Sequence, residues 1–248
     1  MPDTLAVDHD APPWDGPVLM IQTAAGGGYE AMLAATEAHH RAYCAANRVD
    51  YHAWIGIRRG VHAWQASFNR VEMLADLLEQ GFAGWVLYLD ADAVIRQPGF
   101  DIRRYLGKRG GFALIAAPGG AGHWNINDGV FFLNLGHEAG RAIVRNWRDS
   151  AHANLSDEML QAAVAPWQPL PDGRPFPDDQ HLLQMLLMRD ETLARTLLVE
   201  KGGLLNLAAG RFICQFMRVD GAVDDRLALI REAVATAERE CVAAIVLP

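Results

Sequence analysis

The chain has 248 residues, of which 51% are hydrophobic and 21% are charged, a mixture typical of a globular protein rather than a disordered or fibrous one. Lys and Arg number 22 against 30 Asp and Glu, giving a net charge of −8, and an acidic chain without a basic block is a poor candidate for binding nucleic acid. Three widely separated cysteines and the lack of any apolar stretch of about 18 residues argue against a disulfide framework, a structural zinc site and a membrane span.

The first residues differ in composition from the rest. They hold Asp3, Asp8, Asp10 and Asp15 and no Lys or Arg, which predicts a mobile acidic tail over residues 1–16 ahead of one folded domain over residues 17–248. The start of the chain lacks both the basic and the apolar segment of a secretory signal peptide. We therefore expect a soluble cytoplasmic protein, and the preference for Arg over Lys together with the many alanines suggests a bacterial source.

Apolar runs and helical spacings alternate along the chain. The predicted elements are strands over 18–21, 51–57, 85–89, 93–95, 112–117, 130–135 and 212–216, helices over about 29–47, 68–80, 138–148, 179–188 and 225–238, and a proline-rich loop over 165–177. Strands that alternate with helices predict an α/β fold with a mostly parallel sheet. Such sheets bind their ligands beyond the carboxyl ends of the strands.

Two aspartates follow the third predicted strand. The apolar run from Trp85 to Leu89 leads directly into Asp90-Ala91-Asp92. In an extended segment residues i and i+2 point the same way, so both carboxylates lie on one side of the strand end. Paired carboxylate oxygens suit Mg²⁺ or Mn²⁺. The alternative is an acidic turn that caps a short helix, and a second copy of the pattern, Asp8-His9-Asp10, shows how little its bare form means.

Two further segments place polar groups at the ends of predicted elements. Asn127-Asp128-Gly129 precedes an apolar strand, and Gly129 allows the close approach of a ligand or a bulge. A turn around Asn127 explains the same residues without a ligand. Asp178-Asp179-Gln180 opens a helix, in which Asp178 is well placed as the N-cap. Asp179 and Gln180 then lie in the first turn, where a pocket can use them.

Together these segments resemble a known family. Gly84 to Ile95 with its Asp-Ala-Asp, the Asn127-x-Gly129 strand and Asp178-Asp179-Gln180 are similar to the galactosyl-, mannosyl- and xylosyltransferase group of GT-A glycosyltransferases. That group includes galactomannan α-galactosyltransferases, yeast α-mannosyltransferases and xyloglucan α-xylosyltransferases. The passage from His40 to Tyr51 is similar to the helix-to-strand passage of the same group.

The resemblance implies a fold, a donor and a metal. It implies a GT-A domain with a nucleotide-binding half over about 17–117, an acceptor-binding half over about 118–220 and a C-terminal helix over about 225–238. Asp90 is then expected to face the ribose and the metal, and Asp92 to bind the Mn²⁺ or Mg²⁺ that bridges the diphosphate. Thr23 is expected beside the nucleotide base, for which UDP is preferred over GDP.

The resemblance also implies the sugar site and the stereochemistry. Asn127 and Gly129 are expected to approach the donor sugar, and Asp179 and Gln180 to lie near its anomeric carbon, in an enzyme that retains anomeric configuration. A neutral amide such as Gln180 can shield the positive charge that grows on the sugar. The acceptor hydroxyl can lose its proton to the departing phosphate, so no protein base is required. The acceptor itself, a glycan, a peptide or a small molecule, stays open.

The chain departs from the family at two places. The family takes a third metal ligand from a late His-Phe pair, where this chain has Gln215-Phe216, so Gln215 is the expected ligand. Asp220, or Asp224 with Asp225, is the alternative. No residue matches the family's lysine near the start of the second helix. Arg70 is the nearest cation and is expected to lie on the helix surface.

Other functions compete with this prediction. Gly26-x-Gly28-x-x-Ala31 follows the first strand, as in dinucleotide-binding folds, and Arg58-Arg59 can accept a 2′-phosphate, which suggests an NADPH-dependent oxidoreductase. A phosphohydrolase that uses Asp90 as nucleophile lacks the Gly and Thr usual after such a pair. A module that binds a nucleotide sugar without turnover is the remaining alternative. Trp64 and Trp124 are candidates to stack on a sugar or to serve as plain loop residues.

Overall fold

The computed structural model describes residues 7–163, 165, 169, 173, 176–201 and 203–246. In chain order the elements are β1 (Val18–Ala24), α1 (Tyr29–Asn47), β2 (Asp50–Ile55), the 3₁₀ helix η1 (Ala63–Phe68), α2 (Asn69–Glu79), β3 (Trp85–Asp90), β4 (Ala93–Ile95), α3 (Ile102–Gly107), β5 (Leu114–Pro118), β6 (Ile126–Asn134), α4 (Glu138–Asn154), α5 (Asp157–Ala162), α6 (Asp179–Arg189), α7 (Glu191–Arg195), β7 (Leu197–Val199), β8 (Ile213–Gln215), the 3₁₀ helix η2 (Arg218–Asp220) and α8 (Val223–Val246).

A six-stranded sheet in the order β2-β1-β3-β6-β5-β7 forms the centre of the fold. The β1–β2, β1–β3 and β5–β7 pairs are parallel, whereas β6 runs antiparallel to both of its neighbours. The mixed α/β architecture with a mostly parallel sheet, as predicted from the sequence, is therefore confirmed. A second, two-stranded sheet joins β4 and β8.

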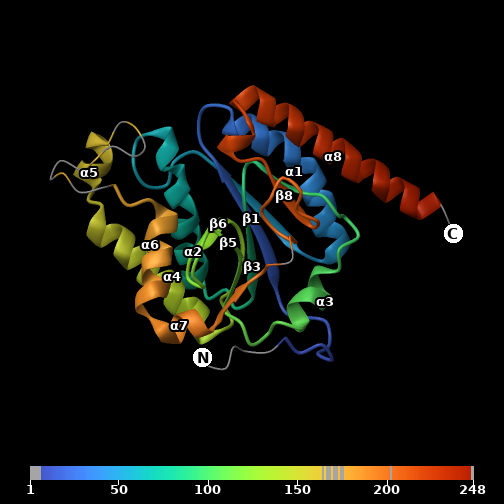
Figure 1. The fold of residues 1–248 in the computed structure, drawn as a ribbon, viewed down its shortest axis with the longest axis horizontal. Coiled ribbons are helices and arrows are strands. Elements are labelled where there is room, and N and C mark those ends of the chain that lie inside the picture. The colour runs from blue at the N-terminus through green and yellow to red at the C-terminus, as the bar shows by residue number, and fades with distance from the viewer. Residues whose placement is uncertain are drawn as a thin grey trace.

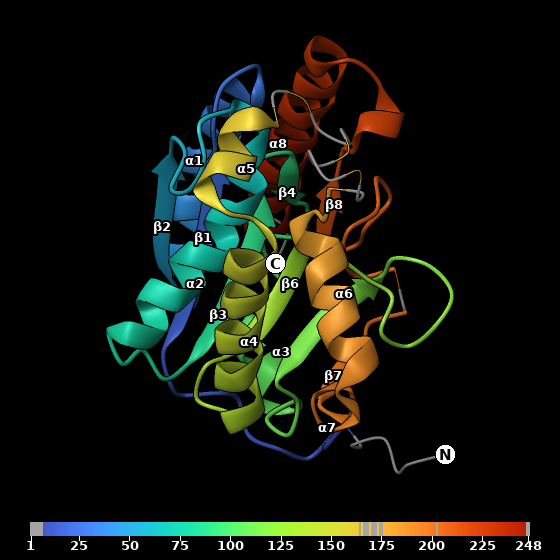
Figure 2. The same cartoon turned by 90° about the vertical axis from the view of Figure 1, so that its left-hand side faces the viewer.

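Helices cover both faces of the central sheet (Figures 1 and 2). One face is covered by α2, α4, α6 and α7, and the other by α1, α3 and α8. Alternate residues of β3 supply the two sides, with Val86 and Tyr88 in one apolar core and Trp85, Leu87 and Leu89 in the other. Burial on both faces explains why this strand has no polar residue before Asp90.

The predicted elements agree with most of the observed ones. The helix predicted over 29–47 is α1, and the helix predicted over 225–238 is longer, spanning Val223–Val246. The short helices α3, α5 and α7 and the three-residue strand β7 were not predicted. Most of the proline-rich loop lies outside the described residues. Among the described helices, none combines the length and apolar character needed to cross a bilayer.

Part of the segment expected as a mobile tail is bound to the domain. Trp14 N donates to Arg103 O at 2.8 Å, and Arg103 Nη1 donates to the carbonyl oxygens of Trp14 and Gly16, both at 3.0 Å. The lack of a side chain at Gly107 allows the backbone of this segment to lie against α3, because a Cβ there would lie 2.0 Å from Pro12 O. Residues 7–16 thus run along α3 in a defined conformation.

A buried histidine fixes the segment that leaves the Asp90-Asp92 turn. His40 Nε2 accepts from the backbone N–H of Ile95 at 3.2 Å, so its Nδ1 carries the proton and donates to Gln22 Oε1 at 2.8 Å. His39 Nε2 donates to Ile95 O at 2.7 Å. Burial, and secondarily His39, lowers the pKa of His40 to about 3. Two side chains of α1 therefore hold both backbone groups of the last residue of β4.

We predict that His40 makes stability depend on pH. The folded-state pKa lies below the unfolded value, so its contribution is fully present above about pH 6.5. That contribution falls by about 1.4 kcal/mol per pH unit as the pH drops from there toward the folded-state pKa. Urea unfolding between pH 7.5 and 4.5 should show a steeper loss of stability in the wild type than in His40→Gln. The control is His52→Gln, which removes an exposed imidazole from β2. Equal slopes in the wild type and His40→Gln contradict the prediction.

Candidate active site

Three strand ends converge at one edge of the central sheet. Thr23 of β1 is the register partner of Asp90 of β3. Because β6 runs antiparallel to β3 with Val130 opposite Leu89, its first residues, including Gly129, lie at the end of β3. The topology thus brings together residues that are about 100 positions apart in sequence.

The small sheet brings in the late segment. Gln215 of β8 is the register partner of Ala93 of β4, and Phe216 N donates to Asp92 O at 3.0 Å. Gln215 therefore lies beside the Asp90-Asp92 turn. Asp220, Asp224 and Asp225 are not among the residues that line the site, and no third carboxylate, thiol or imidazole of the described chain completes a metal-binding group with Asp90 and Asp92.

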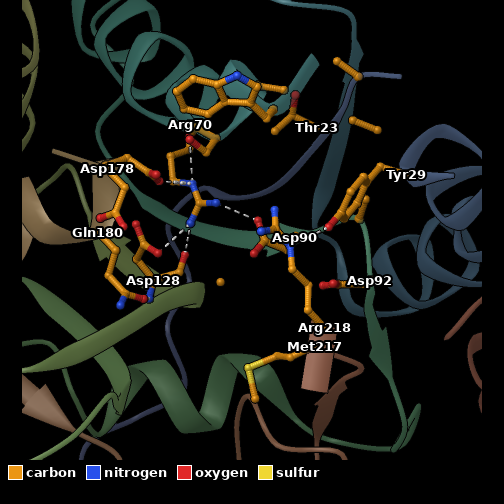
Figure 3. A pocket seen from close by; sticks show the side chains of 18 of the residues that line it. Thr23, Tyr29, Arg70, Asp90, Asp92, Asp128, Asp178, Gln180, Met217 and Arg218 are labelled. Atoms are coloured by element: carbon orange, nitrogen blue, oxygen red, sulfur yellow. Dashed lines mark hydrogen bonds and ion pairs between the residues drawn. The ribbon is translucent and has the colours of Figure 1, made fainter. Parts of the chain in front are cut away.

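A pocket of about 540 Å³ opens at this edge (Figure 3). Residues from β1, β3, β6, α6 and β8 line it, and they include all of those predicted to contact the donor, the metal or the sugar: Thr23, Asp90, Asp92, Asn127, Gly129, Asp179, Gln180 and Gln215. Tyr29, Trp64, Arg70, Asp128 and Arg218 line the same pocket.

Arg70 is the electrostatic centre of the pocket. Its Nη2 donates to Asp90 Oδ1 at 2.8 Å, its Nη1 lies 2.9 Å from Asp128 Oδ1, and its Nε lies 3.0 Å from Asp179 Oδ2. The guanidinium also lies over the Tyr88 ring, 4.5 Å from its centroid. The three carboxylates come from β3, β6 and α6, so one cation joins three separate elements.

The prediction that Arg70 lies on the helix surface is wrong. Its side chain is buried, and all of the first seven residues of α2 are buried, Asn69 to Ala75. The beginning of this helix is enclosed on every side, so a single apolar stripe does not describe it. The three aspartates raise the pKa of Arg70 and outweigh the opposing effect of burial.

Asp128 was ambiguous in the sequence and is a buried member of the site. Burial raises its pKa well above the usual carboxyl range, and the carboxylates of Asp179 and Asp90 add to that increase against the opposing effect of Arg70. Its Oδ2 is buried without a hydrogen-bond partner in the described structure. Asp128 N donates to Gln180 Oε1 at 3.2 Å, which fixes the amide of Gln180 against β6.

Asp90 and Asp92 direct their carboxylates at the same amide. Gln215 Nε2 donates to Asp90 Oδ2 at 3.1 Å and to Asp92 Oδ1 at 2.8 Å. Burial raises the pKa of Asp90, and burial together with the Asp90 carboxylate raises the pKa of Asp92 to about 7. By contrast, the second Asp-x-Asp copy forms an exposed turn in which Asp10 N donates to Asp8 Oδ1.

The residues present fit a divalent cation. Gln215 Oε1 is buried without a hydrogen-bond partner in the described structure. Exchanging the amide oxygen and nitrogen would turn that oxygen toward the two carboxylates, and the three oxygens together are ligands of the kind that Mg²⁺ and Mn²⁺ prefer. Asp90, Asp92 and Gln215 would therefore hold a Mg²⁺ or Mn²⁺ ion through oxygen ligands.

Local hydrogen bonds orient the remaining predicted residues. Asn69 Nδ2 donates to Thr23 Oγ1 at 2.7 Å, so the hydroxyl proton of Thr23 is available to a ligand. Asn127 Oδ1 accepts from Gly129 N at 2.7 Å, within the first residues of β6, where the register with β5 is irregular; the alternative of a turn around Asn127 is therefore wrong. Asp178 is the N-cap of α6 and accepts from His181 N at 2.6 Å, as expected for a residue that begins a helix.

Packing against other parts of the chain accounts for two of the three glycines after β1, Gly26 and Gly28, whereas Gly27 has a positive φ of 56° and open space around it. A Cβ on Gly28 would lie 1.8 Å from Val223 Cγ1 of α8, and one on Gly26 would lie 2.7 Å from Ala63 Cβ. These glycines therefore make room for protein side chains. An antiparallel β6 is also foreign to the parallel sheet of dinucleotide-binding domains, so the oxidoreductase alternative loses its structural basis.

The two tryptophans near the site have different positions. Trp64 lines the pocket and makes an edge-to-face contact with Phe176, with ring centroids 4.9 Å apart. Trp124 is not among the lining residues and packs partly buried against the apolar core. Trp64 thus supplies an aromatic wall on the side of the pocket formed by η1.

Comparison with known proteins identifies the fold. No family model matches the chain, and no curated protein does. Among solved structures, a glycosyltransferase involved in the glycosylation of the major capsid of PBCV-1 aligns with a TM-score of 0.63 and 13% sequence identity, over 87% of this chain and 99% of that one. A second structure, A197 from STIV, aligns with a TM-score of 0.33 and 12% identity, over 52% of this chain and 67% of that one, which is too distant to support any argument.

The first of these similarities shows that the chain has a glycosyltransferase fold, the GT-A type predicted from its motifs. At this level of identity the comparison concerns the fold alone.

We predict that removing the Arg70 charge strongly destabilises the protein. Arg70→Met leaves the buried carboxylates of Asp128 and Asp179 and the partly buried carboxylate of Asp90 without their common cation, for which the expected cost is about 3–5 kcal/mol in urea unfolding. The matched control is Arg148→Met, which loses two ion pairs from a side chain that is 34% exposed and should cost at most about 1 kcal/mol. Similar losses in the two variants contradict the role assigned to Arg70.

Proposed function

We propose that the chain is a metal-dependent retaining glycosyltransferase that moves a hexose or pentose from a nucleoside-diphosphate sugar, with UDP preferred, to an acceptor hydroxyl. The observation that carries this proposal is the convergence of the Asp90-Asp92 pair, the Asn127–Gly129 segment of β6 and the Asp179-Gln180 pair in one pocket. The glycosyltransferase fold supports it. Membership of the galactosyl-, mannosyl- and xylosyltransferase group rests on the sequence motifs.

The two sides of the pocket suit the two parts of such a donor. Thr23 and Asp90 lie at adjacent strand ends, and Thr23 offers a hydroxyl proton to the base. Asp128 and Gln180 lie on the opposite side of Arg70 from Tyr29 (Figure 3), and Asp179 is paired with Arg70. Their carboxylate and amide groups can accept hydrogen bonds from sugar hydroxyls. A divalent ion, when bound, supplies positive charge at the leaving diphosphate.

The protein side chains must stabilise opposite charges at the two ends of the breaking bond. Arg218 lines the pocket near Asp92 and can neutralise the diphosphate as negative charge develops there. Gln180, held by Asp128 N, and Asp179, held by Arg70, would face the developing positive charge on the sugar. The acceptor hydroxyl then passes its proton to the departing phosphate oxygen.

We expect UDP or GDP to stabilise the protein only in the presence of Mn²⁺. A ligand at 100 times its dissociation constant adds about 2.7 kcal/mol, which raises the melting temperature of a domain of this size by roughly 5–10 °C. Asp92→Asn should abolish the shift and the release of free nucleotide from the nucleotide sugar. Asp8→Asn, in the exposed second copy of the pattern, is the matched control and should keep both.

Other outcomes would overturn the proposal in distinct ways. A shift with NADPH alone, indifferent to Mn²⁺, would identify an oxidoreductase. A metal-dependent shift without any transfer, tested with UDP-glucose, UDP-galactose, UDP-xylose and GDP-mannose and a mixture of saccharide acceptors, would favour the module that binds without turnover.

We also expect Gly129 to be required at its position. A Cβ there would lie 2.6 Å from both amide atoms of Gln215 and 2.8 Å from Asp90 Oδ2, so Gly129→Ala must displace two of the proposed metal ligands. A displacement of this kind should weaken the metal-dependent binding of UDP by about ten-fold or more. Gly99→Ala is the control, because a Cβ at Gly99 meets nothing within 4 Å. If Gly129→Ala binds UDP with unchanged affinity, Asp90 and Gln215 do not hold the metal in the arrangement proposed for them.

A further inference from the structure

Protein donors engage all four carboxylate oxygens of Asp90 and Asp92. Asp90 Oδ1 accepts from Arg70 and from Tyr88 OH, both at 2.8 Å, and Gln215 Nε2 bonds one oxygen of each aspartate. The last oxygen, Asp92 Oδ2, accepts from Arg226 Nη1 at 2.8 Å. The pair is thus flanked by two guanidinium groups, one on each aspartate.

Arg226 reaches Asp92 from the last helix, and its surroundings keep it there. The residue is 2% exposed and Asp92 is 5% exposed. Arg226 Nη1 also donates to Phe216 O at 3.3 Å, and Nη2 donates to Tyr29 OH at 3.3 Å. Its Nε is buried without a hydrogen-bond partner in the described structure. The guanidinium is therefore incompletely satisfied by the protein, and Asp92 is its carboxylate partner.

A divalent cation on Asp92 would have to bind next to this buried positive charge. Arg226 uses one of the two Asp92 oxygens and neutralises the carboxylate, and like charges in a buried site repel more strongly than in water. A diphosphate changes that balance, because it adds negative charge beside both cations. Tyr29 OH, which Arg226 contacts, also accepts from Arg218 Nε at 3.4 Å. Tyr29 and Arg218 line the pocket next to Asp92 (Figure 3), so a diphosphate at this wall would face Arg218 and lie near Arg226.

We propose that Arg226 is the counter-cation of Asp92 and lowers the affinity of the site for a metal ion. A nucleoside diphosphate, when it binds, neutralises part of the guanidinium charge and so raises that affinity. This inference rests on the proposed function, because it takes Asp90 and Asp92 as the metal ligands. Arg226 is a positioning residue in this scheme. By thermodynamic linkage, the diphosphate and the metal raise each other's affinity by the same factor. Arg226 increases this factor.

The test is Mn²⁺ binding to the intact protein, followed by the loss of the free-ion EPR signal, with and without UDP or GDP. Arg226→Gln removes the charge and keeps an amide donor near Asp92. It should bind Mn²⁺ alone about ten-fold more tightly than the wild type, within the usual range of coupling between sites. With nucleotide present the two proteins should differ by less than about three-fold. Arg226→Lys, which keeps a cation, should behave as the wild type.

Two further variants serve as controls. Arg231→Met removes an exposed charge from the same helix and should leave Mn²⁺ affinity unchanged. Arg226→Met is a second neutral variant if the Gln variant does not fold. If the wild type and the neutral variants bind Mn²⁺ with equal affinity in the absence of nucleotide, the role of Arg226 is overturned. The proposed function stays intact in that case, provided that the wild type still binds Mn²⁺ in the presence of nucleotide. Absence of Mn²⁺ binding in every protein, with or without nucleotide, overturns the metal site itself.

Discussion

The guanidinium of Arg70 lies among carboxylates from β3, β6 and α6, and without it two buried carboxylates and a partly buried one would lie close together with no shared counter-charge. The pairing is costly in isolation, since each ion loses its hydration. It is tolerated because one planar group satisfies three partners and stacks on Tyr88. The relative position of the sheet edge and the first turn of α6 depends on this contact, and the shape of the pocket depends on that position.

The β4–β8 ladder and α8 position the residues on the side of the pocket where Asp92 lies. The β4–β8 ladder places Gln215 opposite Ala93, and α8 places Arg226 on Asp92. Each aspartate of the pair thus has its own arginine, one from an early helix and one from the last. The two differ in what surrounds them. Arg70 is shared among three carboxylates, whereas Arg226 has a single carboxylate partner in the described structure and a buried N–H left without an acceptor.

Much of the pocket follows from strand ends and motifs. Alternation of strands and helices predicted the sheet, and the carboxyl end of the third strand predicted the place of Asp90 and Asp92. The resemblance to a known family added Thr23, Asn127 and Gly129. The order of the motifs added Asp179 and Gln180 to the predicted site, and a comparison of the late segment with the family added Gln215 to it. Whether these residues perform the roles assigned to them stays a prediction. The short helices α3 and α7 were missed because so few residues carry too little periodic signal.

The arginines could not be predicted in the same way. Arg70 lies off the apolar stripe of its helix, and only the tertiary enclosure of α2 reveals that it is buried. Arg226 pairs with a residue 134 positions away, and nothing in the local sequence marks such a contact. The glycine run misled for a related reason. Gly28 makes room for a side chain of the distant helix α8, and a glycine used in this way has the same local signature as one in a phosphate-binding turn.

The contact between Gly28 and Val223 has a consequence for how the protein is made. Synthesis proceeds from the N-terminus, and early segments can fold before late ones exist. The first strand, its loop and the aspartate pair can form while α8 is still absent, yet the groove at Gly28 and the carboxylate of Asp92 stay uncovered until Val223 and Arg226 arrive. The acidic site is therefore complete only when α8 has docked.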